Sequence, residues 1–433
     1  MKYLAPAYIY TPEGLQTNKL LAISEDGCID SISDIETSVF APSDVEFLPG
    51  IALLPGFVNV HSHVFQRALR GHTHRPLSQK DTFWTWRNAM YAEAQRLTPD
   101  SLFTQALQTY REMLAAGYTS VGEFHYVHHQ PGGQPYADPN AMSEAIIRAG
   151  QEAGIRAVLL MTAYAQAGFR LPPEDGQRRF CDASVEAYLS RVEALRSRGA
   201  SIGLAPHSVR AVPEDWFRAI ASYGSAHHLP LHVHPDEQIA EIEQCRAVYG
   251  CTPVELLERF GALGPQTTII HATHASDQEI ALLARRRCTV CVCPTTEGDL
   301  GDGIAPYAEL LAASIPLCIG SDSNTRLAPV EELRWAEYSA RMRYQRRRIL
   351  VADEISSPGT LLLDYGTHFG AASLGLRTGV LLPGMYADFI GVDLNHPAMT
   401  GWNVDDFLDV LFFGASSEVI TQTWVGGSRR GSG

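Results

Sequence analysis

The stretch "LLPGFVNVHSH", residues 53–63, is an apolar, β-branched run that ends in two histidines around a serine. Its composition predicts a buried β-strand, and side chains two residues apart on a strand point to the same side. His61 and His63 would therefore present their imidazole rings together at the end of this strand. Buried imidazoles are unfavourable unless something satisfies them, so a metal ion is one candidate partner for the pair.

Further strand-like runs follow this stretch and alternate with amphipathic segments. Eight apolar strands alternating with helices predict an α/β fold, a (β/α)8 barrel of the TIM type. The predicted strands cover 53–62, 119–128, 156–164, 201–209, 229–236, 267–275, 288–296 and 315–322, and the predicted helices include 97–116, 141–153, 184–198, 213–226, 238–260 and 328–350.

The two ends of the chain have short strands and turns but no long helical pattern. They include "LLAISEDGCIDSIS" near the start and "LLPGMYADFIGVDL" near the end. We therefore predict a small β-sandwich domain formed by both termini, residues 1–52 plus 379–433. It would pack beside a barrel of residues 53–378 that carries the chemistry.

Charge and composition limit the classes of partner. The chain has 433 residues and a formal net charge of −14, which argues against nucleic acid and against an anionic membrane surface. No basic segment followed by an apolar leader is evident at the start, and no run is long enough to span a bilayer. These features predict a cytoplasmic protein without a membrane partner. An anionic substrate would need a local cluster of arginines.

The eight cysteines do not form the pattern of a disulfide framework. The closest group is Cys288, Cys291 and Cys293 in "RRRCTVCVCPTTE". This spacing could bind a metal, but the β-branched surroundings favour buried, reduced thiols on a strand.

Ionisable residues gather where the predicted strands end, on the face where barrel enzymes place their chemistry. His61 and His63 would supply two metal ligands, "HVHPDEQ" a third and Asp322 of "GSDS" a fourth. Imidazole and carboxylate ligands suit zinc, and a catalytic zinc lowers the pKa of bound water toward neutrality. The prediction is one Zn²⁺ ion.

Strand geometry does not decide which histidine of "HVHPDEQ" binds the metal, because His232 and His234 lie two residues apart. We take His234 as the ligand and His232 as a candidate supporting residue. Glu237 lies three residues beyond His234, where it could transfer a proton between water and a leaving group. By contrast, we expect His128 and His129 in the "HHQPGGQP" loop to be solvated.

Lysine usage bears on the number of metal ions. The lysines are Lys2, Lys19 and Lys80, and none lies in a predicted barrel strand. No lysine could therefore be carboxylated to bridge two ions, which excludes a two-metal site built in that way.

The motifs resemble a known group of enzymes. "PGFVNVHSH", the His234-to-Glu237 element, "IIHATH" and "GSDS" resemble the amidohydrolase superfamily in its mononuclear deaminase branch, and "PGMYADFIGVDL" is similar to its terminal β-domain. Within that branch, "HSHVFQRALRG", "EFHYVHH", "APHSVRAV" and "PTTEGDLGDG" resemble the formimidoylglutamate deiminase family. That family hydrolyses N-formimidoyl-L-glutamate to N-formyl-L-glutamate and ammonia in histidine degradation, using a zinc-activated water.

The resemblance implies roles for particular residues and a homodimeric assembly. It implies zinc ligands at His61, His63, His234 and Asp322; catalytic roles for Glu237, His271 and Asp322; and substrate contacts at Gln66, Arg87, Tyr126, His207 and Arg210. The substrate that the resemblance implies is a small dicarboxylate, and two arginines could each hold one carboxylate with paired hydrogen bonds. Whether Asp322 or Glu237 takes the first proton from water stays open.

The sequence departs from the family pattern in one place and leaves alternatives. Pro235 and Asp236 stand where small or apolar residues are expected before the glutamate, which leaves the shape of that loop uncertain. A related deaminase could instead act on formimidoyl-L-aspartate, a purine or a pyrimidine. A non-catalytic protein that kept the barrel is an alternative of a different class. Such a protein would be free to lose metal ligands, yet every expected ligand and Glu237 are present. The zinc cytidine-deaminase design fits poorly, because no P-C-x-x-C element occurs.

Overall fold

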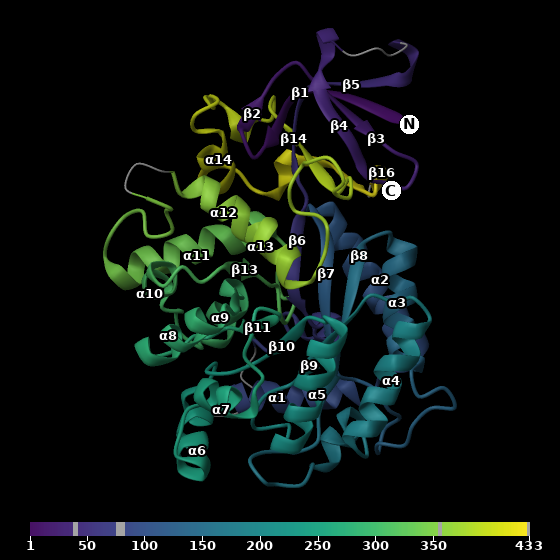
Figure 1. Cartoon of the computed structure of the whole chain (residues 1–433), viewed down its shortest axis with the longest axis vertical. Coiled ribbons are helices and arrows are strands. Elements are labelled where there is room, and N and C mark those ends of the chain that lie inside the picture. The colour runs from purple at the N-terminus through teal and green to yellow at the C-terminus, as the bar shows by residue number, and fades with distance from the viewer. Residues whose placement is uncertain (38–41, 75–82, 354–356, 431–433) are drawn as a thin grey trace.

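The computed structural model describes residues 1–37, 42–74, 83–353 and 357–430. Its strands form two separate sheets, and Figure 1 shows the smaller domain, with both chain termini, at one end of a larger body of strands and helices.

The larger sheet is a parallel barrel of eight strands in sequential order, as predicted. The last strand meets the first through a parallel bridge between Ser62 and Asp322, and the backbone N–H of Asp322 donates to the carbonyl of His61 at 2.9 Å. The strands are β6 (Phe57–Ser62), β7 (Tyr118–His125), β8 (Arg156–Ala163), β9 (Ile202–Pro206), β10 (Leu231–Val233), β11 (Thr267–Ile270), β12 (Thr289–Val292) and β13 (Leu317–Ile319).

The stretch that opens the barrel begins in the other sheet. Leu54, in β5 (Val45–Pro55), pairs with Ile390 of the small domain, whereas Phe57 pairs with Tyr118 of the barrel. Gly56 alone separates the two strands. A Cβ at Gly56 would lie 2.2 Å from the Thr119 side chain, so only glycine fits this crossing.

Helices follow the barrel strands and pack around them (Figure 1). Where one helix was predicted over 238–260, the structure has two, α6 and α7. Gly250 ends α6 in a left-handed conformation with φ 69°, and Thr252 caps a new helix that begins with Pro253. The helices are α1 (Phe83–Ala94), α2 (Pro99–Ala115), α3 (Ala141–Ala153), α4 (Val185–Ser197), α5 (Glu214–His227), α6 (Ile239–Tyr249), α7 (Pro253–Phe260), α8 (Asp277–Arg286), α9 (Pro294–Leu300), α10 (Tyr307–Ala312), α11 (Pro329–Tyr344), α12 (Pro358–Gly366), α13 (His368–Ser373) and α14 (Phe407–Asp409).

The small β-domain draws strands from both ends of the chain, as predicted. Its described strands are hydrogen-bonded as one continuous mixed sheet, in which β1 and β5 run parallel. Phe389 and Trp424 lie in its separate hydrophobic core. The strands are β1 (Lys2–Thr11), β2 (Gly14–Gln16), β3 (Lys19–Ile23), β4 (Ile29–Asp34), β5, β14 (Phe389–Asp393), β15 (Ile420–Val425) and β16 (Ser428–Arg430).

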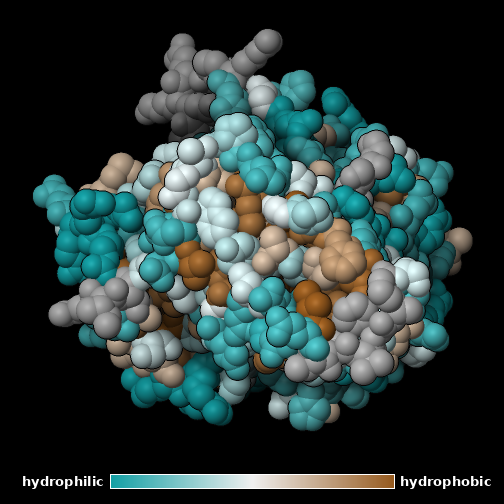
Figure 2. Space-filling view, turned by 90° about the horizontal axis from the view of Figure 1, so that it is seen from above, coloured by the Kyte–Doolittle hydropathy of each residue, from teal (hydrophilic) through white to brown (hydrophobic). Residues whose placement is uncertain are grey.

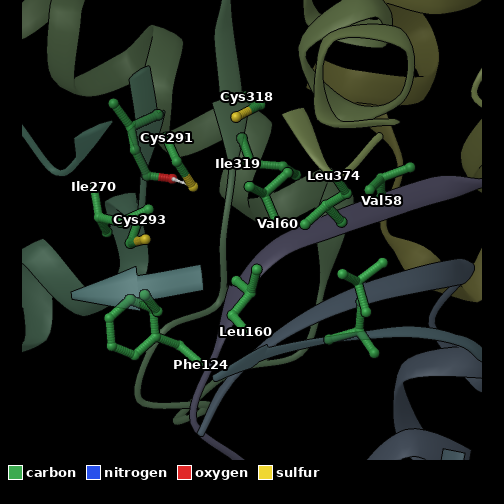
Figure 3. Close-up of a cluster of buried hydrophobic side chains, with 14 of the residues drawn as sticks. Val58, Val60, Phe124, Leu160, Ile270, Cys291, Cys293, Cys318, Ile319 and Leu374 are labelled. Carbon is green, nitrogen blue, oxygen red and sulfur yellow. Dashed lines mark hydrogen bonds between the residues drawn. The ribbon is translucent and has the colours of Figure 1, made fainter. Parts of the chain in front are cut away.

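The main hydrophobic core brings together side chains from several barrel strands (Figure 3). Three free thiols belong to this core: Cys291 in β12, Cys293 directly after β12, and Cys318 in β13. This agrees with the preference for buried thiols over a three-cysteine metal site. Within the described ranges, no helix combines the length and the apolar character needed to cross a membrane.

Candidate active site

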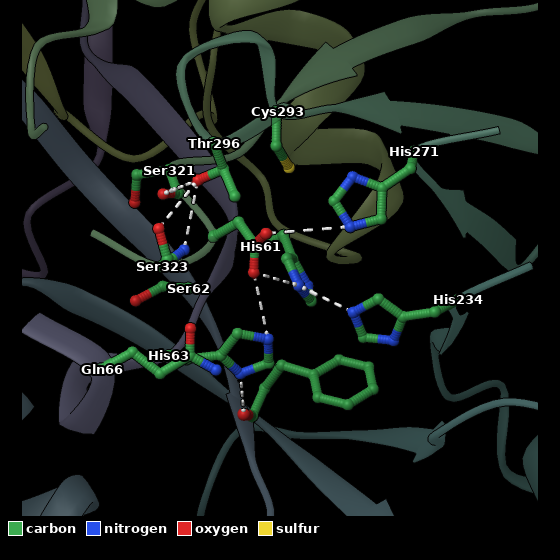
Figure 4. A network of polar contacts seen from close by, with 12 residues as sticks. His61, Ser62, His63, Gln66, His234, His271, Cys293, Thr296, Ser321 and Ser323 are labelled. Carbon is green, nitrogen blue, oxygen red and sulfur yellow. Dashed lines mark hydrogen bonds and ion pairs between the residues drawn. The ribbon is translucent and has the colours of Figure 1, made fainter. Parts of the chain in front are cut away.

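Three histidines from distant parts of the chain converge at the mouth of the barrel, where Figure 4 shows their rings turned toward one another. One nitrogen from each of His61, His63 and His234 lies within 4.8 Å of the others. Asp322 reaches the same point, and its Oδ1 lies 3.3 Å from Nε2 of His61 and 3.2 Å from Nε2 of His63. The four predicted metal ligands therefore lie together.

The hydrogen bonds of the rings direct their lone pairs into the site. Nδ1 of His63 donates to the carbonyl of Phe124 at 2.8 Å, and Nδ1 of His234 donates to the carbonyl of His207 at 3.1 Å. A proton on Nδ1 leaves Nε2 as an acceptor in a neutral ring. Nε2 of His234 lies only 3.0 Å from Nε2 of His61.

The protonation preferences of the rings suit a cation. Burial lowers the pKa of His61 to about 3 and also lowers the pKa of His234 well below its usual value. Neutral imidazoles with converging lone pairs, next to a carboxylate, form the donor set that zinc prefers. The residues present therefore fit a metal ion.

Backbone conformations at the strand ends aim several of these side chains. Asp236, His271 and Asp322 adopt left-handed conformations, with φ of 58°, 70° and 44°. Non-glycine residues rarely do so, and such strain concentrates at functional sites. The sequence left the shape of the "HPDE" loop open. In the structure a hydrogen bond holds this loop, because the N–H of His274 donates to the carbonyl of Asp236 at 3.0 Å.

His232 does not support the metal ligands. The strand β10 ends at Val233, so the two-residue alternation that would align His232 with His234 stops before His234. The ring of His232 is fully buried, and its Nε2 donates to the carbonyl of Ser373 at 3.1 Å, in the segment of α13. The supporting role considered for His232 is therefore wrong.

Glu237 and His271 lie beside the metal ligands. Nε2 of His271 lies 3.8 Å from Oε1 of Glu237 and 3.7 Å from Oδ2 of Asp322. Burial raises the pKa of Glu237 above its usual value, which favours a carboxyl group that can take up and release a proton. Burial opposes a charge on His271, but Glu237 and Glu297 raise the pKa of its ring well above the usual value.

The residues implied to contact substrate line the same pocket as Glu237 and three of the predicted metal ligands, His63, His234 and Asp322. Nε2 of Gln66 donates to the hydroxyl of Tyr126 at 2.8 Å. Arg87 of α1 places its guanidinium 5.4 Å from the ring centre of Tyr91. His207 and Arg210 enter the pocket from the loop after β9.

Two buried glutamates with supporting roles were missed in the sequence analysis. Glu297 lies 3.2 Å from Nδ1 of His271 and also accepts the backbone N–H of Cys293, so it fixes the orientation of the His271 ring. Glu123 accepts hydrogen bonds from the Ser62 hydroxyl and the Val64 N–H, both at 2.8 Å. It thereby holds the Ser62 side chain and the Val64 backbone, on either side of His63. Glu297 directly follows the predicted strand 288–296, which was an available signal. Glu123 lies inside the predicted strand 119–128 and comes near the strand end only because β7 ends at His125.

The histidines expected to be solvated are buried. His128 is 0% exposed and its Nε2 donates to the carbonyl of Thr162 at 2.8 Å. His129 is 5% exposed and its Nε2 lies 3.4 Å from Asp182. The backbone N–H groups of both residues donate to the carbonyl of Arg179, which holds the loop against the body of the protein.

Comparison with known proteins identifies the family. The Amidohydrolase family description matches residues 52–430. The chain belongs to the amidohydrolase family. It is 40% identical over 421 residues to a formimidoylglutamate deiminase from Pseudomonas aeruginosa, covering 96% of this chain and 91% of that protein. The resemblance to formimidoylglutamate deiminases inferred from the motifs is thereby confirmed.

Two further relatives of this amidohydrolase-family chain are more distant. An 8-oxoguanine deaminase from Pseudomonas aeruginosa is 30% identical over 441 residues, covering 98% of this chain and 92% of that protein. The crystal structure of an amidohydrolase from Brucella melitensis superposes with a TM-score of 0.90 at 34% identity, covering 100% of this chain and 95% of that one. The barrel with a small terminal β-domain is thus the fold of this family.

Proposed function

We propose that this protein is a zinc-dependent deiminase that hydrolyses N-formimidoyl-L-glutamate to N-formyl-L-glutamate and ammonia. The observation that carries the proposal is one pocket in which Arg87 and Arg210 lie with Glu237 and the metal-binding histidines. A nucleobase pocket would use aromatic stacking and amide contacts, whereas two arginines match the two carboxylates of this substrate. The relative that is 40% identical is named a formimidoylglutamate deiminase, which supports this substrate.

Arginines in the pocket also reconcile an anionic substrate with an acidic protein. The net charge of −14 would repel a dicarboxylate at long range. Inside the pocket, guanidinium groups in a buried setting interact strongly with carboxylates. Burial and the neighbouring Arg210 hold the pKa of His207 well below the usual value, so this ring is neutral and the positive charge comes from the arginines. Gln66 and Tyr126 offer neutral hydrogen-bonding groups beside them.

The metal would be held by His61, His63, His234 and Asp322, as one zinc ion. Bound zinc supplies Lewis-acid chemistry that lowers the pKa of water toward neutrality. Glu237 and His271 line the pocket together with three of these ligands, His63, His234 and Asp322. The donor types support zinc over hard oxygen-preferring cations such as magnesium.

The chain's own groups then move the protons. Water adds to the formimidoyl carbon, and Glu237 or Asp322 accepts its proton. This proton reaches the imine nitrogen of the substrate through Glu237, which gives a tetrahedral adduct with one hydroxyl and one amino group. The hydroxyl then loses the second proton and becomes the carbonyl oxygen. Glu237 passes that proton to the amino nitrogen, so that the C–N bond breaks and ammonia leaves. His271, protonated and held by Glu297, stabilises the negative charge that develops at the attacked carbon's substituents.

A substrate panel tests the proposal. The purified protein is incubated with formimidoyl-L-glutamate, formimidoyl-L-aspartate, 8-oxoguanine and adenosine, and the released ammonia is measured. We expect the highest kcat/KM with formimidoyl-L-glutamate. Faster turnover of the aspartate analogue would assign the shorter substrate, and preference for a nucleobase or nucleoside would overturn the assignment.

Two expectations from the sequence stay predictions. The homodimer can be tested by light scattering on the purified protein, where a mass near that of one chain would contradict it. The cytoplasmic location can be tested by cell fractionation with an activity assay.

A further inference from the structure

A second buried carboxylate lies beside the arginine that receives the substrate. Glu241 is in the first turn of α6, and its side chain and that of Arg210 are 5% and 10% exposed. Oε1 of Glu241 lies 3.8 Å from Nε of Arg210, and both residues line the pocket that contains Glu237. The catalytic scheme described above gives Glu241 no role.

The geometry differs from that of a purely structural ion pair in the same protein. Nε and Nη2 of Arg156 donate to the two carboxylate oxygens of Asp388 at 2.7 and 3.0 Å, a bidentate arrangement that satisfies both partners. The Arg210–Glu241 pair lies beyond hydrogen-bond distance. Glu241 is thus near enough to influence Arg210 electrostatically without forming such a pair with it.

Binding of a substrate carboxylate to Arg210 creates a charge imbalance. The guanidinium of Arg210 would then face both the substrate carboxylate and the carboxylate of Glu241. A buried carboxylate without its own partner is strongly unfavourable. Protonation of Glu241 removes the imbalance and supplies an O–H donor for the incoming carboxylate. We propose that Glu241 is a substrate-recognition residue, and that the substrate carboxylate on Arg210 binds together with a proton on Glu241. This inference rests on the proposed function.

The surroundings of Glu241 make this proton uptake easy. Burial raises the pKa of Glu241 to about 7, with Glu237 acting in the same direction and with Arg210 and His271 opposing it. Two further titratable groups interact with Glu241. Burial and Glu279 raise the pKa of Asp236, in the loop before α6, and burial and Cys251 raise the pKa of Cys245 on α6; Glu241 adds to both shifts. Near neutral pH the carboxyl group of Glu241 can therefore accept a proton at little cost.

Kinetics across pH test the proposal with Glu241→Gln. In the zinc-loaded wild type, KM for formimidoyl-L-glutamate should rise as pH increases above 7, approaching tenfold per pH unit. Glutamine stays neutral and keeps a hydrogen-bond donor, so the KM of the variant should not depend on pH. At pH 8 it should be about tenfold below the wild-type KM. The zinc content and kcat should remain near the wild-type values. Glu243→Gln, at an exposed position on the same helix, should keep the wild-type profile.

A measurement on the unmodified protein complements the variant. Calorimetric titration with the product N-formyl-L-glutamate, in buffers of different ionisation enthalpy at pH 8, should give uptake of about one proton per ligand. No proton uptake, or a wild-type pH profile in the Glu241→Gln variant, would overturn the inference while leaving the deiminase assignment intact. Absence of formimidoyl-L-glutamate turnover in the wild type would instead refute the proposed function.

Discussion

The two sides of the pocket are built in different ways. On the metal side, the proposed ligands come from the ends of barrel strands and the residues directly after them, and backbone carbonyls fix the ring orientations of His63 and His234. The substrate side takes long side chains from a helix and a loop, with Arg87 on α1 and Arg210 after β9. In this protein the barrel strands position the proposed metal ligands precisely, whereas the arginines proposed to hold the substrate are longer side chains with more conformational freedom.

Removal of the metal should have the largest effect. Dialysis against a chelator should bring ammonia release from formimidoyl-L-glutamate to background, because the metal side then lacks its Lewis acid. Activity should return with about one equivalent of zinc per chain, measured by metal analysis. Full activity of the metal-free protein would contradict a catalytic role for a metal ion at this side of the pocket.

Glu237→Gln should have the next largest effect. Glutamine keeps the shape of the side chain but cannot carry a proton between water and nitrogen, so kcat should fall about 10²- to 10⁴-fold. Metal analysis should still find zinc, because Glu237 is not among the four ligands. The exposed Glu243→Gln variant is the matched control. A near-normal kcat would contradict the proposed role of Glu237 in proton transfer.

Arg87→Met should have the smallest effect of the three and should act on binding. Loss of hydrogen bonds to a charged carboxylate weakens binding by about 1.5–3 kcal/mol, which corresponds to about a 10- to 150-fold rise in KM. The pH dependence of KM should persist, because Glu241 and Arg210 remain. Arg285→Met, at an exposed position on α8, serves as the control. An unchanged KM would mean that Arg87 does not hold a carboxylate.

The metal side was accessible to sequence reasoning because its signals are local. The two-residue spacing of His61 and His63 and the three-residue step from His234 to Glu237 are visible in short stretches. Barrel topology then brings strand ends together at one mouth. The termini also showed short-strand patterns, and both contribute strands to the small sheet.

The parts that sequence reasoning missed depend on contacts between distant segments. Glu123 supports His63 across neighbouring strands, and Glu297 supports His271, yet neither lies in a spacing pattern with its partner. The substrate contacts came from family resemblance alone. His232 was misjudged because the point where β10 ends, one residue before His234, cannot be read from an apolar run.

The crossing at Gly56 has a consequence for how the protein can be divided. The chain leaves the terminal sheet at Pro55 and reaches His61, the first proposed metal ligand, after only five intervening residues. Any tilt of that sheet would pull directly on the first barrel strand. A chain trimmed to the barrel alone would lose the pairing between β5 and β14 that fixes the backbone just before β6. The terminal sheet and the barrel are therefore best kept together in any shortened form of the protein.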